Sequence, residues 1–141
     1  MNGVLTGISA IVAAVGVVFA ARTFAFNGRV NRARFLYDLH RDFFVNETYS
    51  YAKKLIDEPS NLDKLRQAIA DETDELIGFL NFFELVAYYS RRNVLRQEDV
   101  DALLGYYLDR LCRHAEVVKY VKSQQTSFEH LSWLLGKRER R

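Results

Sequence analysis

The sequence is poor in the residues that interrupt helices and in those that form covalent cross-links. Its 141 residues include one proline, one cysteine and seven glycines. A single cysteine cannot form an internal disulfide, which excludes a fold held by disulfides and is compatible with a reducing compartment. The shortage of proline and glycine favours long helices. Because hairpin signals, internal repeats and low-complexity blocks are lacking too, the sequence predicts an all-α fold.

Motifs for catalysis, metal binding and nucleic-acid binding are also lacking. The formal net charge is +2, which is too small to indicate a nucleic acid polymer as a partner. The three histidines are scattered without the spacing of a zinc site, and Cys112 has no neighbouring base on its own helix face. The sequence holds no Gly-rich phosphate loop and no convergent acid, base and nucleophile. We therefore expect no metal, no cofactor and no enzymatic activity.

The longest run without a charge lies near the N-terminus, over residues 3–21. As a helix it would be roughly 28 Å long, close to the thickness of a bilayer's hydrocarbon core. A cleaved signal peptide is the alternative, but it would have a basic start and a shorter apolar stretch. A buried core helix would show a polar face. We predict a single uncleaved transmembrane helix within an anchor of residues 1–26.

The charges around this run predict its orientation. No Lys or Arg precedes it, and four arginines follow: Arg22, Arg29, Arg32 and Arg34. The positive-inside rule therefore places the N-terminus outside and the rest of the chain in the cytoplasm. The same arginines can contact anionic lipid headgroups. We expect a basic juxtamembrane segment over residues 27–34 and a basic tail over residues 137–141.

One face of the predicted span carries small side chains, spaced four, three and four residues apart: Ser9, Ala13, Gly16 and Ala20. Small residues let helix backbones approach closely in lipid, where packing drives association. This interpretation predicts a homo-oligomer held partly by its spans. The alternative, that alanine and glycine are simply common in such helices, stays open.

Residues 35–136 are predicted to form a bundle of four or five helices. Apolar residues at helical spacing indicate a first helix over residues 29–44 and a short one that ends before Glu58 and Pro59. The longest helix is expected over residues 62–92. Its middle is apolar nearly all round, so it should be the central helix of the bundle.

The remaining helices follow from capping signals. Asn93 can take the left-handed position that ends the long helix, and a further helix is predicted over residues 97–122. Thr126 and Glu129 form the pattern T-x-x-E, which predicts a capping box at the start of the last helix.

Two polar residues, Asn81 and Glu84, lie within the apolar middle of the long helix. A carboxylate in such surroundings must be paired, protonated or facing a partner. Two interpretations of Glu84 stay open. It is either a ligand contact or ionisable switch at an oligomer interface, or it pairs with an Arg or Lys of a neighbouring helix. We expect both residues to be buried or at an interface.

The end of the long helix combines rings with bases: Tyr88, Tyr89, Arg91 and Arg92. Such surfaces can bind phosphorylated or nucleotide ligands by ion pairing and stacking. The competing explanation is that the helix dipole favours bases near a helix C-terminus. These four residues are the candidate ligand site.

Two segments, Arg41–Asp57 and Phe79–Leu111, resemble a known family. The second segment ends in a helix with the bulky pair Tyr106-Tyr107, and it contains a core pattern formed by Asn81, Phe82, Glu84, Arg91 and Leu95. With the N-terminal apolar run and its basic flank, the chain resembles a family of small bacterial membrane-anchored proteins known as a domain of unknown function. The resemblance implies an anchored helical bundle in a bacterial inner membrane and assigns no activity.

We expect a non-enzymatic, single-span interaction or oligomerisation module. Its expected partners are membrane lipids, further copies of the chain and a protein or small anionic ligand. The alternative hypothesis is a ligand-gated membrane effector of a bacterial antiphage system. In that case an anionic second messenger such as a cyclic nucleotide binds near Arg91 and Arg92, and oligomeric spans then disturb the membrane.

Overall fold

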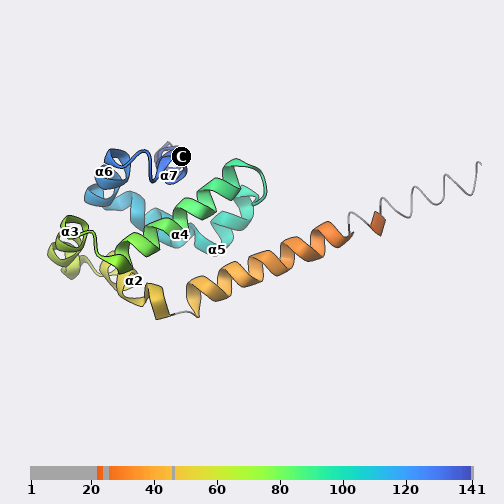
Figure 1. Cartoon of the computed structure of the whole chain (residues 1–141), viewed down its shortest axis with the longest axis horizontal. Coiled ribbons are helices and arrows are strands. Elements are labelled where there is room, and N and C mark those ends of the chain that lie inside the picture. Colours follow the sequence, from red (N-terminus) through yellow and green to blue (C-terminus); the bar gives the residue numbers. More distant parts are fainter. Residues whose placement is uncertain (1–21, 24–25, 46, 141) are drawn as a thin grey trace, which may run out of the picture. The chain divides into compact units, whose positions relative to one another are not determined.

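The computed structural model describes residues 22–23, 26–45 and 47–140, and within them it contains helices and no strand (Figure 1). The all-α prediction is therefore confirmed. The predicted span, with Ser9, Ala13, Gly16 and Ala20, lies outside the described residues. Of the helices that the structure describes, none is both long and apolar enough to cross a membrane. The chain divides into two compact units, Met1–Asp42 and Phe43–Arg141, which are described separately.

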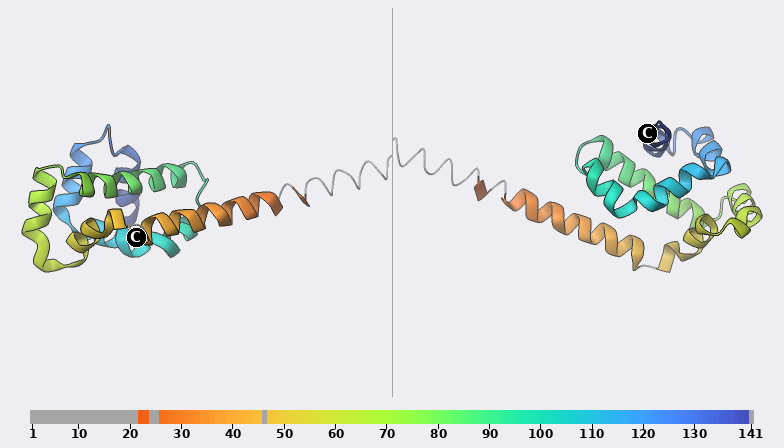
Figure 2. Two further views of the ribbon diagram at one scale, coloured as in Figure 1. Left: turned by 60° about the horizontal axis from the view of Figure 1, so that its bottom comes forward. Right: turned by 180° about the vertical axis from the view of Figure 1, so that it is seen from behind.

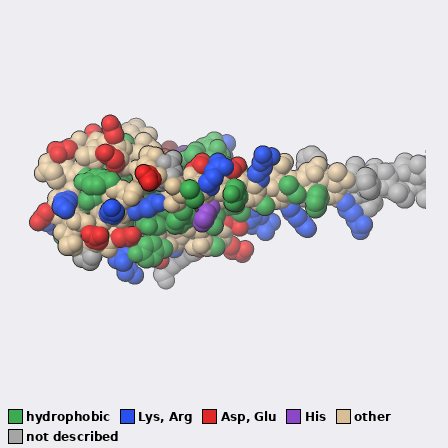
Figure 3. Space-filling model, turned by 90° about the horizontal axis from the view of Figure 1, so that it is seen from below, with side chains coloured by type: hydrophobic (Ala, Val, Ile, Leu, Met, Phe, Trp, Pro, Cys, Tyr) green, Lys and Arg blue, Asp and Glu red, His purple; other side chains and the backbone are tan. Residues whose placement is uncertain are grey.

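The first unit contains most of a helix over residues 26–44, close to the predicted 29–44. Figure 3 shows arginine side chains along this helix, interspersed with hydrophobic ones. One of its faces includes Leu39, which is 8% exposed. Another face is exposed and apolar, and we call it the exposed stripe: Phe26, Val30, Ala33 and Tyr37. Its spacing of four, three and four residues is that of the a and d positions of a heptad.

Within its described residues, the second unit contains six α-helices and two short 3₁₀ helices. They are η1 (Glu47–Tyr49), α2 (Ser50–Asp57), η2 (Pro59–Asn61), α3 (Leu62–Ala70), α4 (Asp74–Arg91), α5 (Gln97–Arg113), α6 (Ala115–Ser123) and α7 (Glu129–Glu139). The prediction of four or five helices is wrong because both of the long predicted helices are interrupted.

The predicted helix over residues 62–92 breaks between α3 and α4. Glu72 takes a left-handed conformation with φ 48°, and its N–H donates to the carbonyl of Ile69 at 3.3 Å. The N–H of Thr73 donates to the carbonyl of Ala68 at 3.1 Å. This pair of hydrogen bonds is the Schellman motif that closes helix C-termini. The motif usually has glycine at the left-handed position, so a glutamate there gave no signal for the break.

The predicted helix over residues 97–122 breaks at His114. Its backbone is extended, with φ −88° and ψ 95°, and it separates α5 from α6. The imidazole Nε2 lies 2.9 Å from the carbonyl oxygen of Ile56 at the end of α2. A contact between residues 58 positions apart therefore accompanies the break, and no proline or glycine marks it.

Helix α4 is central, as predicted. It contacts η1, α2, α5 and α7, and its buried residues include Leu76, Leu80 and Val86. Asn93 ends it in a left-handed conformation with φ 57°, which confirms the predicted cap. After a short loop, α5 runs back antiparallel beside α4 (Figure 1, Figure 2).

An aromatic cluster forms the core around α4. The side chain of Phe43 is fully buried, and its ring stacks on that of Phe82 with the centroids 4.8 Å apart. The centroid of the Phe43 ring also lies 5.1–5.8 Å from those of Phe79, Phe83 and Tyr107. The centroid of Phe79 lies 5.0 Å from that of Phe83 and 6.3 Å from that of Tyr107. The three phenylalanine rings of α4 are thus packed inside the unit.

Helix α7 continues into the segment expected to be a basic tail. Arg138 lies on α7 with its side chain 15% exposed. Its guanidinium donates to Asp101 and Asp109 of α5 at 2.5 Å each, and to the carbonyl of Gly105 at 3.2 Å. A Cβ at Gly105 would lie 3.1 Å from Nη2 of Arg138, so the glycine allows this close approach. This charge network joins α7 to α5.

Candidate functional site

The carboxylate of Glu84 holds the start of α7. Glu84 is half-buried on α4, and its Oε1 accepts a hydrogen bond from the N–H of His130 at 3.1 Å. Its Oε2 accepts one from the N–H of Leu131 at 2.6 Å. The first N–H groups of a helix have no partner within the helix, and the positive end of its dipole favours a carboxylate. Glu84 is therefore paired with backbone of α7, and not with the Arg or Lys side chain of the second interpretation.

The predicted capping box at Thr126 and Glu129 is not formed. Helix α7 begins at Glu129 itself, and Phe128 before it makes no side-chain cap with the described backbone. The carboxylate of Glu129 instead accepts a hydrogen bond from Nη1 of Arg91 at 2.6 Å. Capping is thus supplied from another helix by Glu84. Asn81 is exposed, so it is not buried within the unit, and its expected place at an interface stays a prediction.

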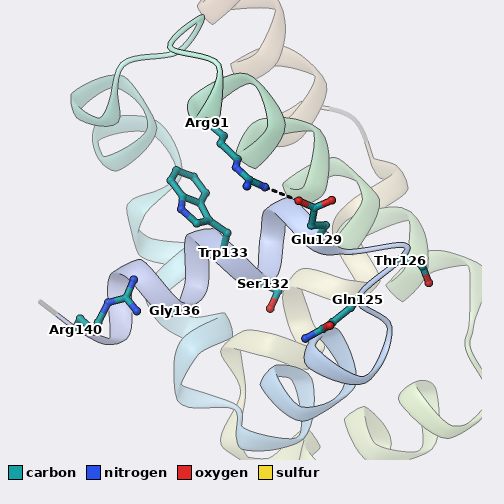
Figure 4. A pocket seen from close by; sticks show the side chains of 8 residues that line it. All are labelled: Arg91, Gln125, Thr126, Glu129, Ser132, Trp133, Gly136 and Arg140. Carbon is teal, nitrogen blue, oxygen red and sulfur yellow. Dashed lines mark hydrogen bonds and ion pairs between the residues drawn. The ribbon is translucent and has the colours of Figure 1, made fainter.

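A groove of about 660 Å³ lies along α7 (Figure 4). Arg91 enters it from the last turn of α4, and Gln125 and Thr126 border it from the turn before α7. The remaining lining residues are Glu129, Ser132, Trp133, Gly136 and Arg140. Figure 4 shows the side chain of Trp133 between the two arginines. The groove therefore combines an aromatic wall with bases and neutral polar groups.

Arg91 is the side chain that links the two helices at the groove. Besides its bond to Glu129, its Nη1 lies 3.2 Å from Nδ1 of His130, and its guanidinium carbon lies 5.9 Å from the ring centroid of Trp133. The hydrogen bond and the charge of Arg91 lower the pKa of Glu129, so this carboxylate is ionised and its charge is offset. No described residue is hydrogen-bonded to Nε or Nη2 of Arg91.

Of the four residues of the candidate ligand site, the structure places Arg91 in the lining of the groove and the other three outside it, with Tyr88 and Arg91 both beside the imidazole of His130. Arg91 lines the groove, whereas the guanidinium of Arg92 lies 5.1 Å from the ring centroid of Tyr88. The ring of Tyr88 in turn lies 5.4 Å from that of Tyr89 and 5.2 Å from the imidazole of His130. Trp133 and Arg140 could not be recognised from the sequence, because only the packing of α7 on α4 places them in one groove with Arg91.

A second polar cluster, around Lys53, supports the fold. The ammonium of Lys53 donates to the carbonyl oxygen of Phe43 and lies 4.5 Å from its ring centroid. Burial lowers the pKa of Lys53, and the charge of Asp57 acts in the opposite direction. Burial, followed by the charge of Asp57, raises the pKa of Tyr107 to about 12. A lysine at the last carbonyls of a helix is a common capping arrangement, and we assign this cluster that role.

The described part of the structure offers little support for a cysteine nucleophile or for a metal site. Burial raises the pKa of the Cys112 thiol, which disfavours the thiolate that a nucleophile needs. In the part of the chain that the structure describes, no group of His, Cys, Asp or Glu side chains is placed to hold a metal ion. The groove along α7 is therefore the candidate site.

Comparison with known proteins identifies a family. A family model described as a domain of unknown function (DUF4760) matches residues 10–137. No curated protein and no solved structure matches the chain. The matched range includes the second half of the apolar run as well as nearly the whole helical part.

Proposed function

The chain belongs to the DUF4760 family, and we propose that it is a membrane-anchored helical module that associates with further copies of itself. The apolar run over residues 3–21 is long enough to span a bilayer as a helix, and the arginines after it favour a cytoplasmic bundle at a bacterial inner membrane. The family match begins inside this run, which supports treating the run and the bundle as parts of one domain.

The observation that carries self-association is the exposed stripe. Phe26, Val30 and Tyr37 are 65%, 49% and 65% exposed and lie on one helix face, and contiguous exposed apolar patches commonly mark interaction sites. Their heptad spacing suits a parallel pairing of two such helices, and copies anchored in one bilayer would present them in parallel. Ser9 and Gly16 precede Val30 by whole numbers of heptads, so a continuous helix would bring part of the small face into the same seam.

The charges beside the stripe predict how this association responds to salt. Arg29 and Arg34 flank the stripe at the g and e positions of the heptad. In a parallel pair, Arg29 of one copy lies beside Arg34 of the other, and the two charges repel each other. Salt or anionic headgroups screen such surface charges. The association should therefore strengthen as ionic strength rises.

Substitutions on the stripe test self-association of the full chain in detergent or lipid nanodiscs. We expect Val30→Glu to weaken the oligomer at least about tenfold by native mass spectrometry, because it places a charge in the seam. Asn31→Glu, which adds the same charge at the next exposed residue, is the matched control and should leave the mass distribution unchanged. Gly16→Leu with Ala20→Leu tests the span in the same way. Equal behaviour of Val30→Glu and Asn31→Glu would count against the stripe.

The anchor is tested separately, by extraction and by fusions. The full chain should stay with membranes after a carbonate wash, whereas Ile11→Arg with Val15→Arg should release it. Each arginine at the centre of a span costs about 2.5–3.5 kcal/mol of insertion free energy, and Ile11→Leu with Val15→Leu is the control.

Fusions to the C-terminus test the orientation of the anchor. A fluorescent protein at this end should be active, and alkaline phosphatase at the same end should be inactive. The opposite pattern would reverse the proposed orientation.

A further inference from the structure

The groove along α7 offers hydrogen-bond donors that the described part of the protein does not use. Arg91 commits Nη1 to Glu129, which leaves Nε and Nη2 available. No bond within the described residues engages the guanidinium of Arg140 or the indole N–H of Trp133. A guanidinium with open donors is suited to bidentate recognition of a phosphate or carboxylate.

The charge of the groove favours an anion. The groove is lined by two arginines, Arg91 and Arg140, and by one carboxylate, Glu129, which is already paired with Arg91. The ammonium of Lys137 adds a further positive charge, 5.3 Å from the ring centroid of Trp133. The anion site is distinct from the N-terminus of α7, because Glu84 occupies the N–H groups there.

The apolar side of the groove favours a planar ring. Trp133 supplies a broad aromatic wall, and indoles bind planar rings by stacking and edge contacts. Gly136 lies one turn further along α7, where no described heavy atom comes within 4 Å of the position of a Cβ. The volume of about 660 Å³ lies within the range of sites for small organic molecules.

We propose that this groove binds a small organic phosphate that carries a planar ring, as a nucleoside monophosphate does. The phosphate lies at Arg91, and the ring lies against Trp133 in the space beside Gly136, on the side toward Arg140. Gln125, Thr126 and Ser132 supply neutral polar contacts for the part between them. This binding goes beyond the proposed function and does not depend on the anchor or on self-association.

Trp133 is the single tryptophan of the chain, so its fluorescence reports on the groove directly. The full chain in detergent is titrated with adenosine monophosphate, adenosine and inorganic phosphate. We expect saturable quenching by adenosine monophosphate and at least about tenfold weaker binding of either component, because each lacks one half of the recognised chemistry. If inorganic phosphate binds as strongly as the nucleotide, the groove does not recognise a ring. If adenosine binds as strongly as the nucleotide, the groove does not recognise the phosphate.

Two matched pairs of variants locate the binding. Arg91→Gln should weaken it at least about tenfold, whereas Arg113→Gln, which removes an exposed arginine at the end of α5 outside the groove, should leave it unchanged. Gly136→Leu should occupy the space beside Trp133 where the ring is placed and weaken binding at least about tenfold, and Gly136→Ala should retain it. Both side chains suit a helix and meet open space at this position, so the fold should persist, which circular dichroism checks. Absence of saturable quenching in the native chain, or quenching unaltered in Gly136→Leu, would overturn the proposal.

Discussion

Replacing Phe43 by alanine is expected to lower the free energy of unfolding by about 3–5 kcal/mol. Its ring is fully buried and stacks on Phe82, with Tyr107 at 5.1 Å and Phe83 at 5.5 Å between ring centroids. Removing it leaves a cavity in the centre of the aromatic cluster and deprives the ammonium of Lys53 of its closest ring. Domains of this size have total stabilities of about 5–15 kcal/mol, so the loss would be a large part of the whole.

Phe44→Ala is the matched control, because the neighbouring ring is 41% exposed and the same atoms are removed. We expect it to cost about 1 kcal/mol or less. Urea unfolding of the full chain in detergent, followed by circular dichroism, measures both. Phe43→Leu should lie between them, and it keeps the comparison usable if the alanine variant does not fold. Equal costs at positions 43 and 44 would contradict the central place of Phe43 in the core.

Helix positions and the central place of α4 could be predicted because local periodicity determines which face is apolar. In α2, for example, the buried residues are Ala52, Leu55 and Ile56, and the second and third follow the first by three and four residues, the spacing of one helix face. The two breaks could not be predicted in this way. Glu72 and His114 are ordinary helix residues, and the break at His114 coincides with a contact to the carbonyl of Ile56, far away in the sequence.

The candidate site was predictable only in part, for the same reason. Arg91 was recognisable as a base that follows two tyrosines at the end of the long predicted helix, whereas Trp133 and Arg140 join it in the groove through the packing of α7 on α4. Glu84 was recognisable as a carboxylate that needs a partner. Its partner is backbone, which has no signature in the sequence, so no pairing of charged side chains could identify it.

The groove also bears on the alternative of a ligand-gated membrane effector. That function needs a ligand site, association of copies and a span, and these have separate supports in the groove, the exposed stripe and the apolar run. Each is tested by a different experiment above. If a nucleotide binds and also changes the oligomer of the full chain, the gated function is favoured. If it binds without such a change, the groove serves another purpose.

Replacing Glu84 by alanine is expected to lower the free energy of unfolding by about 2–4 kcal/mol. The carboxylate accepts hydrogen bonds from the N–H groups of His130 and Leu131, and charge-assisted bonds of this kind contribute about 1.5–3 kcal/mol each when they are shielded from water. Glu84 is half-buried, so water replaces part of the loss and the sum falls below twice that value. Glu84→Gln keeps an acceptor oxygen without the charge and should cost less.

Glu129→Ala provides the contrast, because it removes a carboxylate that belongs to the first turn of α7, the turn that Glu84 caps. The side chain of Glu129 is 64% exposed in its ion pair with Arg91. Exposed pairs contribute about 0–1 kcal/mol, so we expect this variant to unfold almost as the native chain does. Hydrogen exchange distinguishes the two roles further. The amides of His130 and Leu131 should exchange faster in Glu84→Ala and stay protected in Glu129→Ala, because only the first change removes their acceptor. Unchanged protection in Glu84→Ala would show that α7 is held by its packing on α4 alone.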